Sequence, residues 1–90
     1  MQHYKITVKG HVQGVSFRFY TQKAARQFHI TGSVRNHPEG YVEIQAAAEE
    51  QNMQDFIEWC HNGPALADVT AVTVTTAPEQ PAYTDFKIIA

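Results

Sequence analysis

The 90-residue sequence is poor in cysteine and has no long apolar run. Its single cysteine, Cys60, excludes an internal disulfide framework and a CxxC metal or redox pair. No stretch approaches the about 20 apolar residues that a membrane-spanning helix needs. The first residues show no basic segment followed by an apolar run, so we expect a cytoplasmic protein.

The sequence also lacks an excess of basic residues. Seven Lys and Arg stand against nine Asp and Glu, which gives a formal net charge of −2 with His neutral. This balance argues against a nucleic-acid partner or an anionic membrane surface, so any bound anion needs a small local site. The five histidines form no i, i+4 pair and have no cysteine pair beside them, so we expect no metal and no cofactor.

What the sequence does contain is the material of one small globule. The hydrophobic fraction is 43% and the charged fraction 18%, which is typical of a compact domain and excludes wholesale disorder. A chain of this length predicts a single domain over residues 1–90. For so small a soluble domain, a monomer is the default expectation.

Two periodicities alternate along the chain. Alternating apolar and polar residues predict strands over 4–9, 32–36, 41–46, 72–75 and 86–89, and helical spacing predicts helices over 17–28 and about 49–62. The order is that of two βαβ units joined by a hairpin, with one extra strand at the end. We therefore expect an α+β, ferredoxin-like βαββαβ fold, with both helices on one face of an antiparallel sheet.

The most informative stretch runs from Gly10 to Arg18, where a loop bracketed by Gly10 and Gly14 lies between the first strand and the first helix. Helix starts leave backbone N–H groups unpaired and carry partial positive charge, so a loop curled before one can cradle an anion. Arg18 adds a planar, permanently charged fork that suits two phosphoryl oxygens. Spacing alone favours a tight turn followed by a solvated arginine, because such turns are common and most arginines are solvated.

The same stretch reads G-x-V-Q-G-V-x-F-R, and it resembles the signature of the acylphosphatases. A second block, V-R-N over 34–36 followed by a turn and G-x-V-E over 40–43, is similar to another segment of that family. The chain length and the terminal F-K-I over 86–88 also resemble small acylphosphatases. The resemblance spans essentially the whole chain, and the first motif is the specific one.

The resemblance implies that Arg18 binds the substrate phosphate and that Asn36 positions the attacking water. It further implies a backbone cradle supplied by the loop residues Gly10, His11, Val12, Gln13, Gly14 and Val15. Two positions depart from the family's pattern: Ser33 stands where an aromatic residue is usual, and Glu39 where Asp is frequent. Neither departure touches the phosphate or water ligands, so they bear on substrate fit and hairpin stability.

The activity implied by the resemblance is hydrolysis of acyl phosphates to a carboxylate and inorganic phosphate, without a metal. The carboxylate leaves readily from such a mixed anhydride, so positioning and charge stabilisation can supply most of the rate. The implied partners are a small acyl phosphate and inorganic phosphate, its product and competitor.

Some alternatives stay open at this stage. A non-catalytic sensor or carrier of acyl or carbamoyl phosphate would keep the same cradle, although Asn36 favours hydrolysis. His11 either touches substrate or faces solvent, and we interpret Gln13 as loop-shaping rather than catalytic. Arg35 is expected on the opposite strand face from Asn36, because neighbouring side chains alternate. An RNA-binding module is disfavoured, since strand 41–46 lacks the aromatic pattern that such sheets present.

Overall fold

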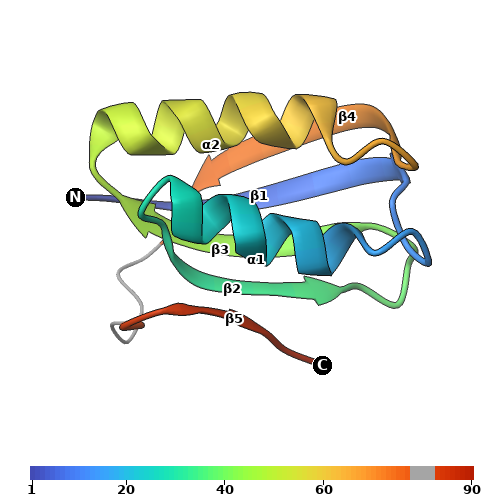
Figure 1. Ribbon diagram of the computed structural model, residues 1–90, viewed down its shortest axis with the longest axis horizontal. Coiled ribbons are helices and arrows are strands. Elements are labelled where there is room, and N and C mark those ends of the chain that lie inside the picture. Colours follow the sequence, from blue (N-terminus) through green and yellow to red (C-terminus); the bar gives the residue numbers. More distant parts are fainter. Residues whose placement is uncertain (78–82) are drawn as a thin grey trace.

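The computed structural model describes residues 1–77 and 83–90. The prolines Pro78 and Pro81 predict a loop after the strand over 72–75, and both lie outside the described residues. The described chain forms two helices and a five-stranded sheet (Figure 1). In order, the elements are β1 Gln2–His11, α1 Phe17–Gln27, β2 Thr31–Asn36, β3 Val42–Ala48, α2 Glu50–Asn62, β4 Asp68–Thr76 and β5 Phe86–Ile88.

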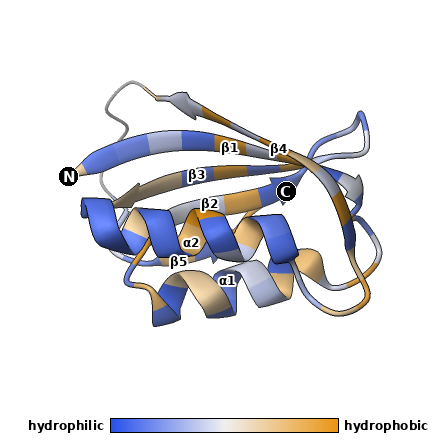
Figure 2. Ribbon diagram, turned by 90° about the horizontal axis from the view of Figure 1, so that it is seen from above, coloured by the Kyte–Doolittle hydropathy of each residue, from blue (hydrophilic) through white to orange (hydrophobic). Residues whose placement is uncertain are grey.

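The strands lie in the order β4-β1-β3-β2-β5, and both helices cover one face of the sheet (Figure 2). Helix α1 packs over β2 and β5, whereas α2 packs over β4, β1 and β3. The ferredoxin-like α+β fold predicted from the sequence is therefore confirmed. The two halves also follow the predicted pattern, in which each helix connects two strands of the same sheet.

The prediction of an antiparallel sheet is wrong for one strand. Pairs β1–β3, β1–β4 and β2–β3 are antiparallel, but β5 pairs with β2 in parallel, with Phe86 opposite Gly32 and Ile88 opposite Val34. Hydropathy alternation reveals that a segment is a strand but not which way it runs. A short edge strand, reached from the opposite edge of the sheet, carries no hairpin signal that would fix its direction.

The core lies between the sheet and the two helices. The helix-facing residues of the central strands are fully buried, as Ile6, Val8 and Ile44 show, and Phe17 and Phe56 fill the space from the helix side. Figure 2 shows the alternation of apolar and polar residues along these strands. No helix among the described residues has the length and apolar character that a membrane crossing requires.

Most strand boundaries differ by one or two residues from the prediction, and the start of β4 differs by four. β1 runs on to His11 instead of ending before Gly10, because Gly10 and His11 still pair with Val69 and Asp68 of β4. β4 accordingly begins four residues before the alternation that predicted it, at Asp68 rather than at 72. This strand is an edge strand with an exposed surface, so hydrogen bonds to β1, rather than burial, define its length.

Candidate functional site

The predicted site residues come together at one end of the sheet. The connection from β1 to α1, the start of α1 and the end of β2 all lie at that end, although they are distant in sequence (Figure 1). Arg18 is the second residue of α1, and Asn36 is the last residue of β2. The fold therefore gathers both sequence blocks in one place.

The loop over residues 12–16 has an unusual backbone. Gly14 has a φ of 77° and Ser16 a φ of 60°, while Val15 between them keeps a negative φ. An alternation of right-handed and left-handed residues is the backbone pattern of a nest, in which successive amides can bind an anion. A left-handed conformation is strained for Ser16, so the surrounding structure must hold it in place.

The amide N–H groups of this loop are free to bind a ligand. Within the part of the chain that the structure describes, the N–H groups of residues 12–16 donate no hydrogen bond, and the first helical bond runs from Tyr20 N to Ser16 O at 3.2 Å. The first turn of α1 contains no acidic residue that could compete for its N–H groups. Loop and helix start together therefore present a row of unused donors at the positive end of a helix dipole.

The three arginines of the chain are placed differently. The guanidinium of Arg26 donates two hydrogen bonds to the Asp85 carboxylate, at 3.2 and 2.9 Å, and thereby lowers the pKa of Asp85. Arg35 pairs with Glu43 at 3.2 Å, on the sheet face away from the helices. Half-buried Arg18 forms no ion pair with any residue of 1–77 or 83–90. Its charge is therefore available to an anion at the loop.

Asn36 carries an unsatisfied buried acceptor. Its side chain lies on the same strand face as Val34, toward the helices, whereas Arg35 lies on the other face as predicted. The Asn36 Oδ1 atom is buried and has no hydrogen-bond partner among the described residues. A buried polar atom without a partner is rare in native structures, because it costs about 1–3 kcal/mol. A donor such as water would satisfy it.

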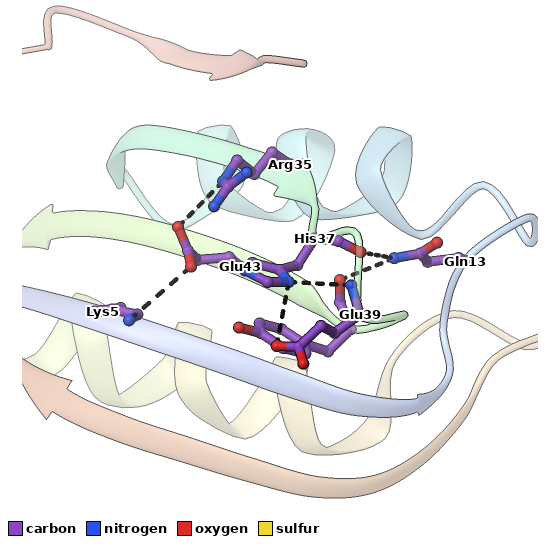
Figure 3. Close-up of polar contacts among 7 residues, drawn as sticks. Lys5, Gln13, Arg35, His37, Glu39 and Glu43 are labelled. Carbon is purple, nitrogen blue, oxygen red and sulfur yellow. Dashed lines mark hydrogen bonds and ion pairs between the residues drawn. The ribbon is translucent and has the colours of Figure 1, made fainter.

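Gln13 ties the loop to the hairpin between β2 and β3 (Figure 3). Its Nε2 donates hydrogen bonds to the carbonyl oxygens of His37, at 2.8 Å, and Tyr41, at 3.0 Å. His37 follows Asn36 directly in the chain. These bonds therefore connect the loop over residues 12–16 to the end of β2. Sequence reasoning saw a loop-shaping residue here, but it could not identify the partners, which are main-chain atoms.

The loop is shorter than the sequence suggested. Gly10 and His11 belong to β1, so only Val12, Gln13, Gly14 and Val15 of the predicted cradle lie outside regular structure. Gly10 sits at a register shift beside β4, where a Cβ would overlap the Asp68 carbonyl oxygen. The absence of a Cβ at Gly10 therefore permits the strand pairing, and its place in the cradle stays a prediction. The His11 side chain is exposed.

Other chemistry has no support at this end of the molecule. Cys60 is fully buried in the core, and desolvation raises the pKa of its thiol to about 12, so it is a packing residue and not a nucleophile. Residues 1–77 and 83–90 contain no group of three His, Cys, Asp or Glu side chains that could hold a metal ion. The site therefore consists of the N–H groups at the positive end of the α1 dipole, the Arg18 guanidinium and the Asn36 side-chain amide.

Residues 4–88 match the family model described as acylphosphatase. The chain belongs to the acylphosphatase family. A relative from Marinobacter nauticus, named acylphosphatase, is 43% identical to it over 91% of this chain and 89% of the relative. The crystal structure of acylphosphatase from Bacillus subtilis has a TM-score of 0.95 at 37% identity and covers 100% of both chains. An acylphosphatase from Coxiella burnetii has a TM-score of 0.92 at 34% identity, covering 98% of this chain and 92% of that one.

These comparisons confirm the resemblance that the two sequence blocks indicated. They cover essentially the whole described chain, including both blocks and the last strand. The two departures from the family's pattern occupy contrasting places: Ser33 is buried within β2, and Glu39 is exposed in the hairpin turn. Neither residue contacts the loop by a hydrogen bond among the described residues.

Proposed function

We propose that the loop over residues 12–16, Arg18 and Asn36 form the catalytic site with which this member of the acylphosphatase family hydrolyses acyl phosphates. The products are a carboxylate and inorganic phosphate. Support comes from loop amides, the Arg18 guanidinium and the Asn36 oxygen, which lie at one end of the sheet and have no hydrogen-bond or ion-pair partner among the described residues. The decisive observation is the Asn36 Oδ1 atom, which has no partner among the described residues. Hydrolysis needs a water as its second reactant, and this oxygen can accept a hydrogen bond from it.

The phosphoryl group binds to the nest of amides and to Arg18. Backbone N–H groups at a helix start, together with a guanidinium, grip the oxygens of a phosphate dianion by charge-assisted hydrogen bonds. The same donors stabilise negative charge as it shifts during phosphoryl transfer. Because the donors are backbone groups fixed by the fold, they need no reorganisation when the reaction proceeds.

The attacking water is held by Asn36. Its Oδ1 accepts one hydrogen of the water, which directs the water's lone pair toward phosphorus. The new bond forms between the water oxygen and phosphorus, and the bond between phosphorus and the acyl oxygen breaks with its electron pair going to the carboxylate. A neutral amide is not a strong base, so the water's proton passes to a phosphoryl oxygen of the substrate.

The experiment is hydrolysis of benzoyl phosphate by the wild type and by Asn36→Ala, with inorganic phosphate as competitor. We expect kcat to fall about 10²-fold to 10³-fold, as when one transition-state hydrogen bond is lost, and the inhibition constant of phosphate to stay within about threefold. Asn62→Ala is the matched control, because Asn62 is an exposed asparagine at the other helix's end. Full activity of Asn36→Ala would refute the proposed role of the water ligand.

A non-catalytic sensor predicts a different result with the same reagents. It would bind inorganic phosphate, and phosphate would raise its melting temperature by mass action, but benzoyl phosphate would not be consumed. The enzyme should show both phosphate protection and turnover without added metal. Absence of protection at millimolar phosphate would contradict the amide nest as the binding site.

The setting in which the site works is also a proposal. Every group named above comes from one chain, which supports a monomeric, single-domain enzyme. Its lone cysteine is buried and is not part of a disulfide among the described residues, which suits a reducing compartment such as the cytoplasm. Light scattering at micromolar concentration checks the oligomeric state, and the expected mass is that of one 10.1 kDa chain.

A further inference from the structure

The loop over residues 12–16 has one side-chain hydrogen-bond connection to the rest of the described chain, and Gln13 makes it. Both hydrogen bonds start from the same Nε2 atom, so the amide uses its two hydrogens on two carbonyl oxygens. Those carbonyls belong to residues 24 and 28 positions further along the chain. The bonds therefore join the loop between β1 and α1 to the hairpin between β2 and β3.

The hairpin that receives these bonds has hydrogen bonds and a ring contact of its own. His37 N donates to Tyr41 O at 2.8 Å, Gly40 N donates to His37 O at 2.9 Å, and the His37 and Tyr41 rings stack with centroids 4.2 Å apart. Each carbonyl that Gln13 binds is thus already fixed by a turn hydrogen bond. A loop attached to this turn is attached to the end of β2, where Asn36 lies.

From this geometry we infer that Gln13 is a positioning residue, which sets the distance between the phosphate held by the loop and the water held by Asn36. The inference rests on the proposed function, because it needs the phosphate at the loop and the water at Asn36. Gln13 itself makes no contact with substrate in this role. It explains why the middle of the loop carries a polar side chain whose hydrogen bonds within the described residues go to main-chain carbonyls. A misplacement of about 1 Å between reacting groups can cost about 10²-fold in rate.

This position requires two N–H hydrogens on one atom and a side chain long enough to reach the hairpin, and glutamine provides both. It supplies two hydrogens from one atom, which a carboxylate cannot do, and it has the reach to span the gap from the loop to the hairpin. Methionine has a similar length and no donor, so Gln13→Met removes both bonds while it keeps the volume. The matched control is Gln22→Met, because Gln22 Nε2 also donates to a backbone carbonyl, that of Phe86 at 2.9 Å, but it fastens α1 to β5.

The experiment measures kcat for benzoyl phosphate and the inhibition constant of inorganic phosphate for both variants. Gln13→Met should lower kcat about tenfold or more and change the phosphate constant by less than about threefold, because the loop amides and Arg18 remain. Gln22→Met should keep kcat within about twofold of the wild type. Equal losses of kcat and of phosphate affinity in Gln13→Met would overturn the positioning role and indicate a merely disordered loop.

The same measurement in an Asn36→Ala background tests the coupling. If Gln13 acts through the water site, Gln13→Met should lower kcat less than about twofold once Asn36 is absent, since residues that act as a unit are not additive. A full tenfold loss in that background overturns the inference and leaves the proposed function intact. Unchanged kcat in Asn36→Ala alone overturns both.

Gln13→Glu provides a second variant if Gln13→Met does not fold. It keeps the length, lacks both amide hydrogens and places a negative charge beside two carbonyl oxygens. Its kcat should fall at least as far as that of Gln13→Met, and circular dichroism checks that its fold is retained. Wild-type kcat in a folded Gln13→Glu protein would contradict the inference.

Discussion

The molecule contains two strand-to-helix connections of the same topological kind, and they are built differently. Between β1 and α1, residues 12–16 form a loop with two left-handed residues and unused amides. Between β3 and α2, only Glu49 intervenes, in extended conformation with φ −66° and ψ 157°, and Met53 N donates to its carbonyl at 2.9 Å. In the β1–α1 connection the backbone N–H groups of residues 12–16 donate to no described residue, whereas the β3–α2 connection begins a helix directly after one residue.

The charges at the two helix starts differ in the same sense. α2 begins with Glu49 and Glu50, whose carboxylates stabilise the positive end of its own dipole. α1 has no acid in its first turn and carries Arg18 there, which disfavours the isolated helix. The comparison teaches that the start of α1 is open to an anion, whereas the start of α2 already has carboxylates of its own chain beside it. The predictions below test that difference.

Arg18→Ala should have the largest effect. It removes the side-chain charge from the α1 connection, and we expect kcat/KM for benzoyl phosphate to fall by about 10³-fold or more. The fold should survive, because no described residue depends on Arg18 for an ion pair. Arg26→Ala is the control, since it deletes the same side chain from the same helix but breaks the pair with Asp85.

Comparing the two variants distinguishes loss of the positive charge at the site from loss of a positive charge elsewhere on α1. Arg26→Ala should keep kcat/KM within about twofold, because an exposed ion pair contributes little to stability. Equal losses in the two variants would mean that α1 as a whole, and not its first turn, supports activity.

Gly14→Ala should have an intermediate effect. A Cβ at this position would meet nothing within 4 Å, so the substitution acts only through the backbone, where φ 77° costs an L residue roughly 1–2 kcal/mol. The loop should relax and turn its amides away, which we expect to lower kcat/KM about 10-fold to 100-fold. Calorimetric titration with phosphate measures the accompanying loss of affinity.

Ser16→Gly is the opposite change in the same loop. It relieves the left-handed strain at φ 60° and removes a hydroxyl that makes no capping hydrogen bond. If the nest is made of backbone alone, kcat/KM should stay within about threefold of the wild type. A tenfold loss would assign a role to the hydroxyl and weaken the amide nest as the binding element.

The sequence predicted the elements of this fold because local pattern and burial agree in most of them. Alternation in β1 and β3 and the stripe over Met53, Phe56 and Cys60 in α2 correspond to residues that are buried. The site blocks were predictable by resemblance, since Arg18 and Asn36 occupy positions in two recognisable motifs. Physical reasoning from spacing alone favoured an ordinary turn with a solvated arginine.

Other features depend on atoms that side-chain patterns do not reveal. The direction of β5 is set by pairing with β2, and the length of β4 by hydrogen bonds at an exposed edge. The role inferred for Gln13 depends on two carbonyl oxygens in a hairpin, and every residue has a carbonyl. Tyr20 follows the helical stripe of α1 yet is 43% exposed, because it lies in a groove between the helices.

Phe19→Glu should have a small effect that comes from charge alone, and it makes the start of α1 resemble that of α2. Phe19 is 56% exposed in the first turn of α1, so a carboxylate there should stabilise the helix by about 0.3–1 kcal/mol. The same carboxylate should repel phosphate and weaken its binding about fivefold at low ionic strength. Phe19→Gln is the matched control, because it loses the edge contact with the Tyr20 ring equally but adds no charge.

The difference between the Glu and Gln variants isolates the electrostatic effect. At about 1 M KCl the Debye length is only about 3 Å, so the two variants should then bind phosphate equally well. Equal affinities already at low salt would show that an acid in the first turn of α1 does not compete with the anion. The contrast between the two helix starts would then rest on loop conformation alone, and the absence of acids from α1 would have no functional meaning.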